Sequence, residues 1–168
     1  DYWLGMLAAL NRVNPATYLD NNRMEGLIGV VPFGLSNEAP IKTKKALKGV
    51  WPGINEEDKV IIWGGGIWNW FDPLSLIEAM NIIGKKRKDI KLFFMGIGHP
   101  TANIDISTAE ECIALSKKYS LYNETIFFND WVPYEERQNY LLESDIGIST
   151  YFNNLETRFS FRTRILDY

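Results

Sequence analysis

Short apolar runs alternate with amphipathic segments along most of this chain, and no other feature restricts the possible folds as strongly. Four runs are rich in β-branched and aromatic residues, as buried strands are. They are KVIIWGG (residues 59–65), KLFFMGIG (91–98), TIFFN (125–129) and IGIST (146–150). Helical patterns follow the first three runs, over residues 72–87, 107–120 and 131–145. The alternation predicts an α/β fold, a doubly wound parallel sheet in three α/β/α layers.

Three helix starts are marked in the sequence. Asp72 is a favoured N-cap residue, and Pro73 stands at the first helical position, where its missing N–H costs nothing. Ser107 and Glu110 have the spacing of a capping box at the second helix. Pro133 opens the third.

The chain is predicted to contain the end of one domain and most of another. Residues 2–13 have a helical pattern, and LIGVVPFGL (27–35) has the composition of a strand. We therefore divide the chain into residues 1–35, a polar linker over 36–57 that prolines and glycines interrupt, and a domain over 58–168. Both ends fall inside helical patterns, so we expect the chain to be a fragment of a longer protein.

Composition excludes some classes of protein. A net charge of −3 and a pI near 5.3 argue against a nucleic-acid-binding module, which normally carries a basic excess. The single Cys112 cannot form an internal disulfide, which favours the cytoplasm. No apolar run reaches the ~18 residues of a membrane span. A peripheral position at the inner face of a membrane stays open.

The first apolar run ends in three glycines, at 64–66, followed by Trp68 and Trp70. Ligands of parallel sheets bind at the carboxyl ends of the strands, where these residues fall. Glycines remove Cβ atoms where a backbone turns sharply or a ligand approaches closely. The run is either a tight turn packed under the tryptophans or a loop that admits a sugar or a diphosphate. A dinucleotide fingerprint needs a third spaced glycine, which is absent.

The next two strand ends carry fewer candidates. The only histidine, His99, is interpreted as a solvated turn residue. Asn129 and Trp131 follow the third strand, where an indole either stacks on a flat ligand or covers the edge of the core. No group of His, Cys and carboxylate residues has the spacing of metal ligands.

The last twenty residues are the richest in candidates. Arg158, Arg162 and Arg164 stand just before or within a predicted helix start, where guanidinium groups and free N–H groups suit a phosphate. Glu156 and Asp167 supply carboxylates that accept hydrogen bonds from sugar hydroxyls. The alternative is an ordinary solvated face.

Taken in order, these segments resemble a known family. Residues 27–35 resemble its VVPNGV strand, 59–80 its first strand–loop–helix unit, 91–98 its L.I.G.G strand, 127–150 its V.F.G.V…Y..ADV.V.PS segment, and FRTRILDY its F..K..EYMA helix start. The family is the group 1 (family 4-like) glycosyltransferases, and the resemblance is to their C-terminal donor-binding domain. That domain is one Rossmann-like half of the two-domain GT-B architecture.

The resemblance implies a transferase that moves a sugar from a nucleoside-diphosphate donor to an acceptor glycan, lipid or small molecule. It implies no obligatory metal. We expect no cofactor and, from the acidic charge balance, no nucleic-acid partner. Residues 1–35 would then end the acceptor-side domain, and the fragment would be inactive alone. Two alternatives stay open: another nucleotide-sugar enzyme such as an epimerase, and a non-catalytic doubly wound domain.

Family positions transfer to this chain one by one. Asp167 falls on the second carboxylate of the E-x7-E pattern, which contacts ribose, and Arg164 falls on the basic position near the diphosphate. Phe159 replaces the first carboxylate, and Glu156 is the candidate substitute. No catalytic residue is assigned. The predicted donor-binding residues are Gly65, Gly66, Trp68, Asn129, Trp131, Glu156, Arg162, Arg164 and Asp167.

Overall fold

The computed structural model describes residues 2–98 and 105–168. The chain divides into two compact units, Asp1–Leu35 and Ser36–Tyr168, which we describe separately. Among the described residues, no helix is both long and apolar enough to cross a bilayer. The assignment of the first unit to an acceptor-side domain stays a prediction.

The first unit holds two helices, α1 (Tyr2–Ala9) and α2 (Pro15–Asp20). The sequence predicts one helix over 2–13, but α1 ends earlier, and α2 was not predicted. Asn14 caps α2: its Oδ1 accepts hydrogen bonds from the N–H groups of Ala16 (3.0 Å) and Thr17 (3.2 Å). The Thr17 hydroxyl accepts in return from the N–H of Asn14, which completes a capping box.

The strand predicted over residues 27–35 is wrong. None of the described residues of this unit, 2–35, belongs to a strand. Val30 and Val31 are each 93% exposed. An isolated strand has no neighbour to complete its hydrogen bonds, and Pro32 removes a donor that pairing needs. The β-branched composition is therefore not sufficient here to form a strand.

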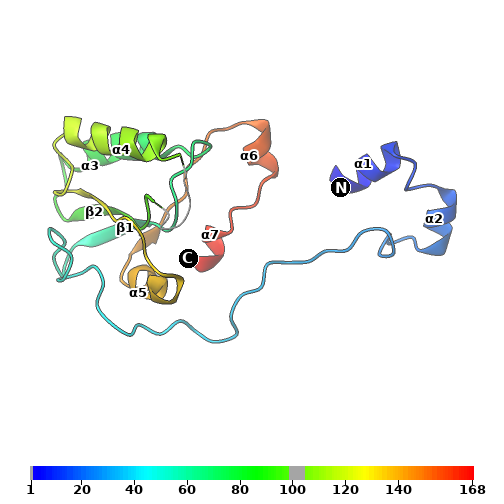
Figure 1. Cartoon of the computed structure of the whole chain (residues 1–168), viewed down its shortest axis with the longest axis horizontal. Coiled ribbons are helices and arrows are strands. Elements are labelled where there is room, and N and C mark those ends of the chain that lie inside the picture. The colour runs from blue at the N-terminus through cyan, green and yellow to red at the C-terminus, as the bar shows by residue number, and fades with distance from the viewer. Residues whose placement is uncertain (1, 99–104) are drawn as a thin grey trace. The chain divides into compact units, whose positions relative to one another are not determined.

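The second unit is built on one parallel sheet (Figure 1). Its strands are β1 (Lys59–Trp63), β2 (Ile90–Phe94), β3 (Ile126–Phe128) and β4 (Ile146–Gly147). Their order across the sheet is β3-β2-β1-β4, and all three neighbouring pairs are parallel. Because the order reverses between β1 and β4, the carboxyl ends of these two strands form the crevice where ligands of such sheets bind.

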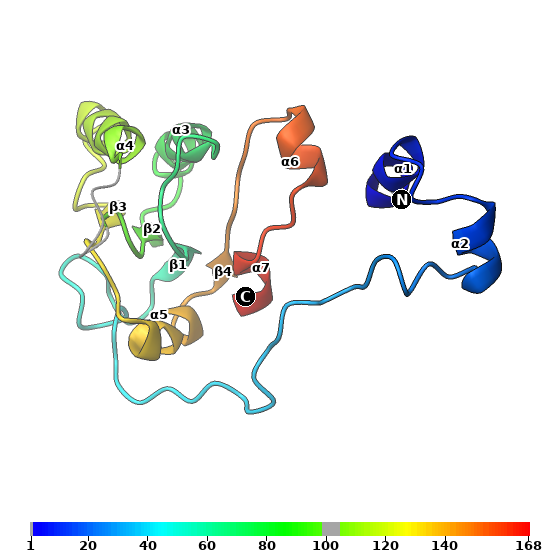
Figure 2. The same ribbon diagram turned by 45° about the vertical axis from the view of Figure 1, so that its right-hand side comes forward.

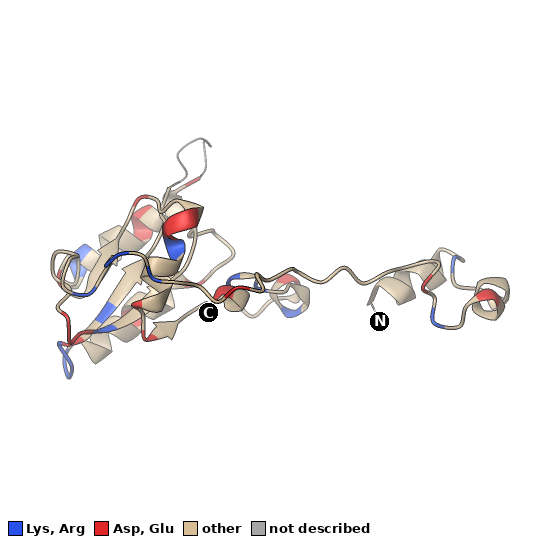
Figure 3. Cartoon of the chain, turned by 90° about the horizontal axis from the view of Figure 1, so that it is seen from below, with Lys and Arg blue, Asp and Glu red and all other residues tan. Residues whose placement is uncertain are grey.

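Helices cover both faces of the sheet, which confirms the predicted α/β fold. The elements are α3 (Pro73–Ile83), α4 (Ser107–Lys118), the 3-10 turn η1 (Tyr134–Glu136), α5 (Arg137–Leu142), α6 (Leu155–Phe159) and α7 (Arg164–Asp167). Helices α3 and α4 lie on one face and α5 on the other (Figures 1 and 2). Lysine, arginine and acidic residues are interspersed over this unit (Figure 3).

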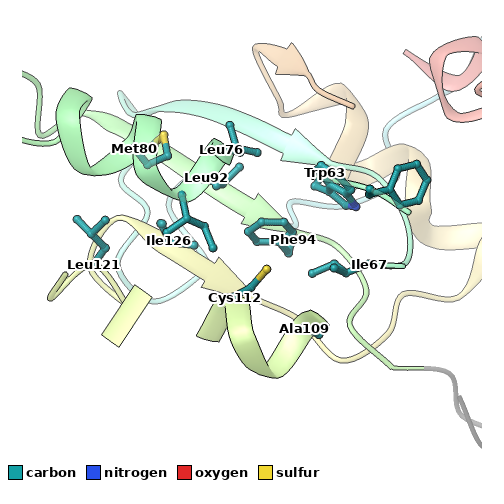
Figure 4. Close-up of a cluster of buried hydrophobic side chains, with 12 residues drawn as sticks. Trp63, Ile67, Leu76, Met80, Leu92, Phe94, Ala109, Cys112, Leu121 and Ile126 are labelled. Atoms are coloured by element: carbon teal, nitrogen blue, oxygen red, sulfur yellow. The ribbon is translucent and has the colours of Figure 1, made fainter. Parts of the chain in front are cut away.

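Each face of the sheet packs its own hydrophobic cluster. Under α3 and α4, the side chains of Leu92 and Phe94 meet those of Met80 and Cys112 (Figure 4). Burial raises the pKa of the Cys112 thiol to about 12, so it stays protonated at neutral pH. On the opposite face, α5 and residues 47–54 cover Val60, Ile62 and Phe93.

Two of the helix starts show how local sequence signals succeed and fail. Asp72 caps α3 as predicted, with its Oδ1 accepting from the N–H of Ser75 at 3.1 Å. The capping box of Ser107 and Glu110 is wrong, because the N-cap of α4 is Ile106 and no side chain caps this helix. Asp105, two residues before Ser107, accepts from its N–H at 2.9 Å instead.

The segment interpreted as a linker, residues 36–57, contains no helix or strand, but its later part packs on α5. The Oε2 atom of Glu143, just after α5, accepts hydrogen bonds from three consecutive backbone N–H groups. They belong to Ala46, Leu47 and Lys48, at 3.0, 2.7 and 3.2 Å. Asn139 Oδ1 accepts from the N–H of Thr43 at 2.8 Å. This part of the segment is therefore fixed to the α/β unit.

Candidate functional site

A cavity of about 250 Å³ opens at the carboxyl ends of β1, β2 and β3, beside the reversal in strand order. We name it the carboxyl-edge cavity. The loop after β1 contributes its three glycines, Ile67 and Trp68 to the lining. The remaining lining residues are Met95, Gly96, Ile97, Gly98, Asp105, Trp131, Val132, Tyr134, Arg137, Leu141 and Asp167. The cavity lies where the sequence predicts ligand binding.

Two hydrogen bonds to the carbonyl of its last glycine fix the glycine loop. The carbonyl oxygen of Gly66 accepts hydrogen bonds from the indole Nε1 of Trp63 (3.1 Å) and from the guanidinium of Arg164 (3.2 Å). Gly65 has a φ of +139°, which side-chain-bearing residues rarely adopt. A Cβ atom at Gly66 would lie 3.0 Å from the indole of Trp68. The loop is thus a tight turn packed against Trp68 that also exposes backbone to the cavity.

Aromatic rings form part of the cavity wall. Trp68 stacks on Trp70, with ring centroids 5.6 Å apart and planes 14° apart. Trp131 lines the cavity after β3 and is 43% exposed. Tyr134, the first residue of η1, lines it as well. Rings of this kind offer apolar faces on which a flat or ring-shaped ligand stacks.

An ion pair between Arg137, at the start of α5, and Asp167, in α7, lines the cavity. An Nη of Arg137 lies 2.9 Å from Asp167 Oδ1, and the other donates to Oδ2 at 3.3 Å. The same guanidinium donates to the Tyr134 hydroxyl at 2.8 Å and stacks on its ring, 3.8 Å from the centroid. Asp167 was predicted, whereas Arg137 and Tyr134 were not.

Arg162 and Arg164 do not line the cavity, although Arg164 reaches the glycine loop through the Gly66 carbonyl. The guanidinium of Arg164 packs over the rings of Phe71 (4.3 Å) and Trp63 (4.8 Å), and burial lowers its pKa. That of Arg162 lies 4.7 Å from the ring centroid of Tyr151. Both have buried nitrogens with no hydrogen-bond partner in the described structure: Nε and Nη2 of Arg162, and Nη1 of Arg164.

Tyr168 joins the carboxyl ends of β1 and β4. Its hydroxyl accepts a hydrogen bond from the N–H of Gly64 at 2.9 Å and donates to the carbonyl of Ile148 at 3.1 Å. Burial raises the pKa of this hydroxyl, which keeps it protonated and able to donate. A Cβ at Gly147 would overlap the Tyr168 ring, so glycine is required there. These contacts fix α7, and with it Asp167, at the cavity.

The structure brings together five of the nine predicted donor-binding residues. Gly65, Gly66, Trp68, Trp131 and Asp167 all line the cavity.

Four predicted residues do not line it. Asn129 is half-buried, and its side chain donates to the carbonyl of Met95 at 3.0 Å, so it links the ends of β2 and β3. Glu156 is exposed on α6. Arg162 and Arg164 pack against the rings of Tyr151 and Phe71 instead. His99 lies outside the described residues, among which no group of three or more metal-ligating side chains occurs.

The sheet and its cavity define an α/β, Rossmann-like domain with a candidate binding site at the carboxyl edge. Comparisons with protein-family models, with curated proteins and with solved structures find no match. The chemistry of the cavity is therefore the basis for a proposed function, and the resemblance to glycosyltransferases stays a prediction.

Proposed function

We propose that the carboxyl-edge cavity binds a nucleoside-diphosphate sugar and that the protein is a glycosyltransferase, which moves that sugar to an acceptor. One observation carries the proposal. The cavity combines a loop of three glycines, aromatic walls and the Arg137–Asp167 ion pair at the carboxyl edge of a parallel sheet. Each of these three features suits a different part of such a donor.

The aromatic walls suit the base. Stacking of a nucleobase on an aromatic side chain contributes roughly 1–3 kcal/mol and needs no particular sequence of polar groups. Trp131 offers a partly exposed indole to the cavity. Asp167 supplies carboxylate oxygens that accept hydrogen bonds from ribose hydroxyls. Base and ribose thus have partners on the side of β3, α5 and α7.

The glycine loop suits the diphosphate and the sugar, because no Cβ atom prevents their approach to the backbone. Arg164 donates to the Gly66 carbonyl of this loop, and Arg162 packs near the same Phe71 ring as Arg164. Among the described residues, neither arginine forms an ion pair with a carboxylate. Their uncompensated positive charge raises the potential at the loop without direct contact with the ligand. It stabilises the negative charge that grows on the leaving diphosphate during sugar transfer.

A thermal-shift screen of this chain against UDP, GDP, ADP, dTDP and NAD tests the binding step. A ligand of the native state raises stability by RT ln(1 + [L]/Kd), about 2.7 kcal/mol at a hundred times Kd. We expect one nucleoside diphosphate to raise the melting temperature. A shift with NAD alone would instead indicate a dinucleotide site and contradict the proposal.

A matched pair of variants locates the binding. Trp131→Ala should weaken binding of the selected nucleotide about ten-fold in calorimetry, by loss of stacking. Trp3→Ala is the control, because Trp3 is also exposed, at 58%, and does not line the cavity. Equal losses in both variants would place the nucleotide elsewhere. In an assay with the donor sugar alone, a changed sugar rather than a free nucleotide would indicate an epimerase.

A further inference from the structure

We propose that Arg137 is a positioning residue that orients the Asp167 carboxylate for recognition of the ribose hydroxyls of the ligand. This inference rests on the proposed function of the carboxyl-edge cavity. It adds a residue from α5 to the site, one that no sequence pattern singled out. Arg137 acts through Asp167 and is not required to touch the ligand.

The geometry of the pair fixes the plane of the carboxylate. Both oxygens of Asp167 face the Arg137 guanidinium, at 2.9 and 3.3 Å. A planar guanidinium that meets both oxygens restricts rotation of the carboxylate, which a point charge such as a lysine ammonium does not. Each carboxylate oxygen keeps a second lone pair, so Asp167 can accept hydrogen bonds from two neighbouring hydroxyls of a ligand.

Tyr134 fixes the guanidinium in turn. Its ring lies under the Arg137 guanidinium, 3.8 Å away, and its hydroxyl accepts a hydrogen bond from an Nη at 2.8 Å. The three side chains come from η1, α5 and α7, and all three line the cavity. The side chains of Arg137 and Asp167 are 28% and 27% exposed, which leaves them accessible to a ligand. The order Tyr134, Arg137, Asp167 is therefore a preorganised chain of contacts.

Charge gives the pair a second role. A carboxylate beside a diphosphate repels it, since both are negative at neutral pH. The guanidinium of Arg137 neutralises Asp167 locally and so removes this repulsion while the oxygens stay available as acceptors. A neutral side chain at position 137 would leave Asp167 both less well oriented and repulsive.

The experiment compares two ligands on four variants. The ligands are the nucleoside diphosphate that the wild-type chain binds best and its 2′,3′-dideoxy counterpart, which lacks the ribose hydroxyls. The variants are Arg137→Gln, Arg137→Lys, Asp167→Asn and the double variant Arg137→Gln/Asp167→Asn. Arg87→Gln is the matched control, because Arg87 pairs with Asp89 before β2, at the opposite edge of the sheet.

We expect Arg137→Gln to weaken binding of the ribonucleotide about ten-fold, as a lost charged hydrogen bond does. Binding of the dideoxy ligand should change less than about two-fold, because that ligand makes no hydrogen bond to Asp167. Asp167→Asn should show the same loss, and the double variant should bind no worse than either single variant. Arg137→Lys should keep part of the preference for the ribonucleotide over the dideoxy ligand. Binding of the dideoxy ligand also reports that each variant is folded.

Three outcomes would overturn the inference. Undiminished discrimination in Arg137→Gln would show that Asp167 needs no positioning by Arg137. Equal losses for both ligands would show that Arg137 contacts the phosphates or only supports the cavity. Additive losses in the double variant would show independent roles. In each of these cases the nucleotide still binds and the proposed function stands, whereas failure of the wild-type chain to bind any nucleotide overturns both proposals.

Discussion

Buried charged side chains have hydrogen-bond partners at the amino edge of the sheet but lack several of them at the carboxyl edge. At the amino edge, the Glu143 side chain is only 4% exposed, yet three backbone N–H groups and the Lys42 ammonium (3.4 Å) donate to it. At the carboxyl edge, Arg162 and Arg164 bury three nitrogens with no hydrogen-bond partner in the described structure. A buried polar group without a partner costs about 1–3 kcal/mol, so the second arrangement lowers stability.

The two arrangements have different consequences for stability. The chain supplies every donor around Glu143, which therefore fixes the segment before β1 to α5. Around Arg162 and Arg164, the described residues supply aromatic rings but no ion-pair partner. Proteins tolerate such local costs mainly at sites that serve something other than stability. The comparison predicts that removing charge destabilises the amino edge and does not destabilise the carboxyl edge.

The largest effect is expected for Glu143→Gln. The amide loses the charge that three N–H groups require and places its own donor among them, so the free energy of unfolding should fall by about 3 kcal/mol. Urea denaturation measures it. Glu57→Gln is the control, because Glu57 is exposed. A change below about 1 kcal/mol would show that the amino edge does not depend on this charge.

A pH titration probes the same edge at Asp145. Burial opposes ionisation, but hydrogen bonds from Lys48, the N–H of Val60 and Lys59 outweigh it and lower the pKa of Asp145 to about 2. A pKa depressed by folding stabilises the native state above the unfolded-state value, 3.8, and this contribution is lost as the pH falls to about 2. We expect a loss of about 1 kcal/mol after solvent screening.

Asp145→Asn identifies the source of this loss. The variant should be less stable at pH 7, and its stability should fall less between pH 4 and pH 2 than that of the wild-type chain. Denaturation at each pH measures both. If the stability of the variant fell as steeply with pH as that of the wild-type chain, other carboxylates would cause the acid sensitivity. Glu143 is one such group, because hydrogen bonds lower its pKa despite its burial.

At the carboxyl edge, removal of a charge should raise the free energy of unfolding instead of lowering it. Arg162→Met removes two unpaired buried nitrogens and keeps apolar contact with Tyr151 and Phe71. The relief of desolvation, less the lost cation–π attraction, should raise the free energy of unfolding by roughly 0.5–1 kcal/mol. Thermal and urea denaturation measure it. Destabilisation comparable with that of Glu143→Gln would remove the contrast between the two edges.

Signals within a few residues predicted much of the fold. The apolar runs predicted all four strands. In β1, β2 and β3, burial on both faces of the sheet selects β-branched and aromatic residues, whereas Ile146 and Gly147 of β4 are exposed. Asp72 and Pro73 gave the start of α3. The capping boxes of α2 and α6 were missed because each pairs an asparagine N-cap with a threonine, Asn14 with Thr17 and Asn154 with Thr157, instead of the common Ser/Thr…Glu pattern.

The candidate site was predicted only where its residues follow strands directly. Trp68 and Trp131 do, and the carboxyl-edge rule places them at the cavity. Arg137 and Asp167 are thirty residues apart, and their pairing depends on how α5 and α7 pack. The direction of Arg164, towards the carbonyl of Gly66, depends likewise on the packing of Phe71. Such contacts are tertiary and leave no periodicity in the sequence.

The smallest effect is expected for an ion pair that is not buried. Lys45 and Glu56 form an ion pair of 2.8 Å near the amino edge, but both side chains are exposed. Glu56→Gln should leave the urea midpoint unchanged within error, because solvent and salt already screen an exposed pair. If this variant were as unstable as Glu143→Gln, the loss of an ion-pair partner alone would determine the loss of stability, whether or not the pair is buried. An unchanged midpoint shows instead that charge matters at this edge only where the chain has removed it from water.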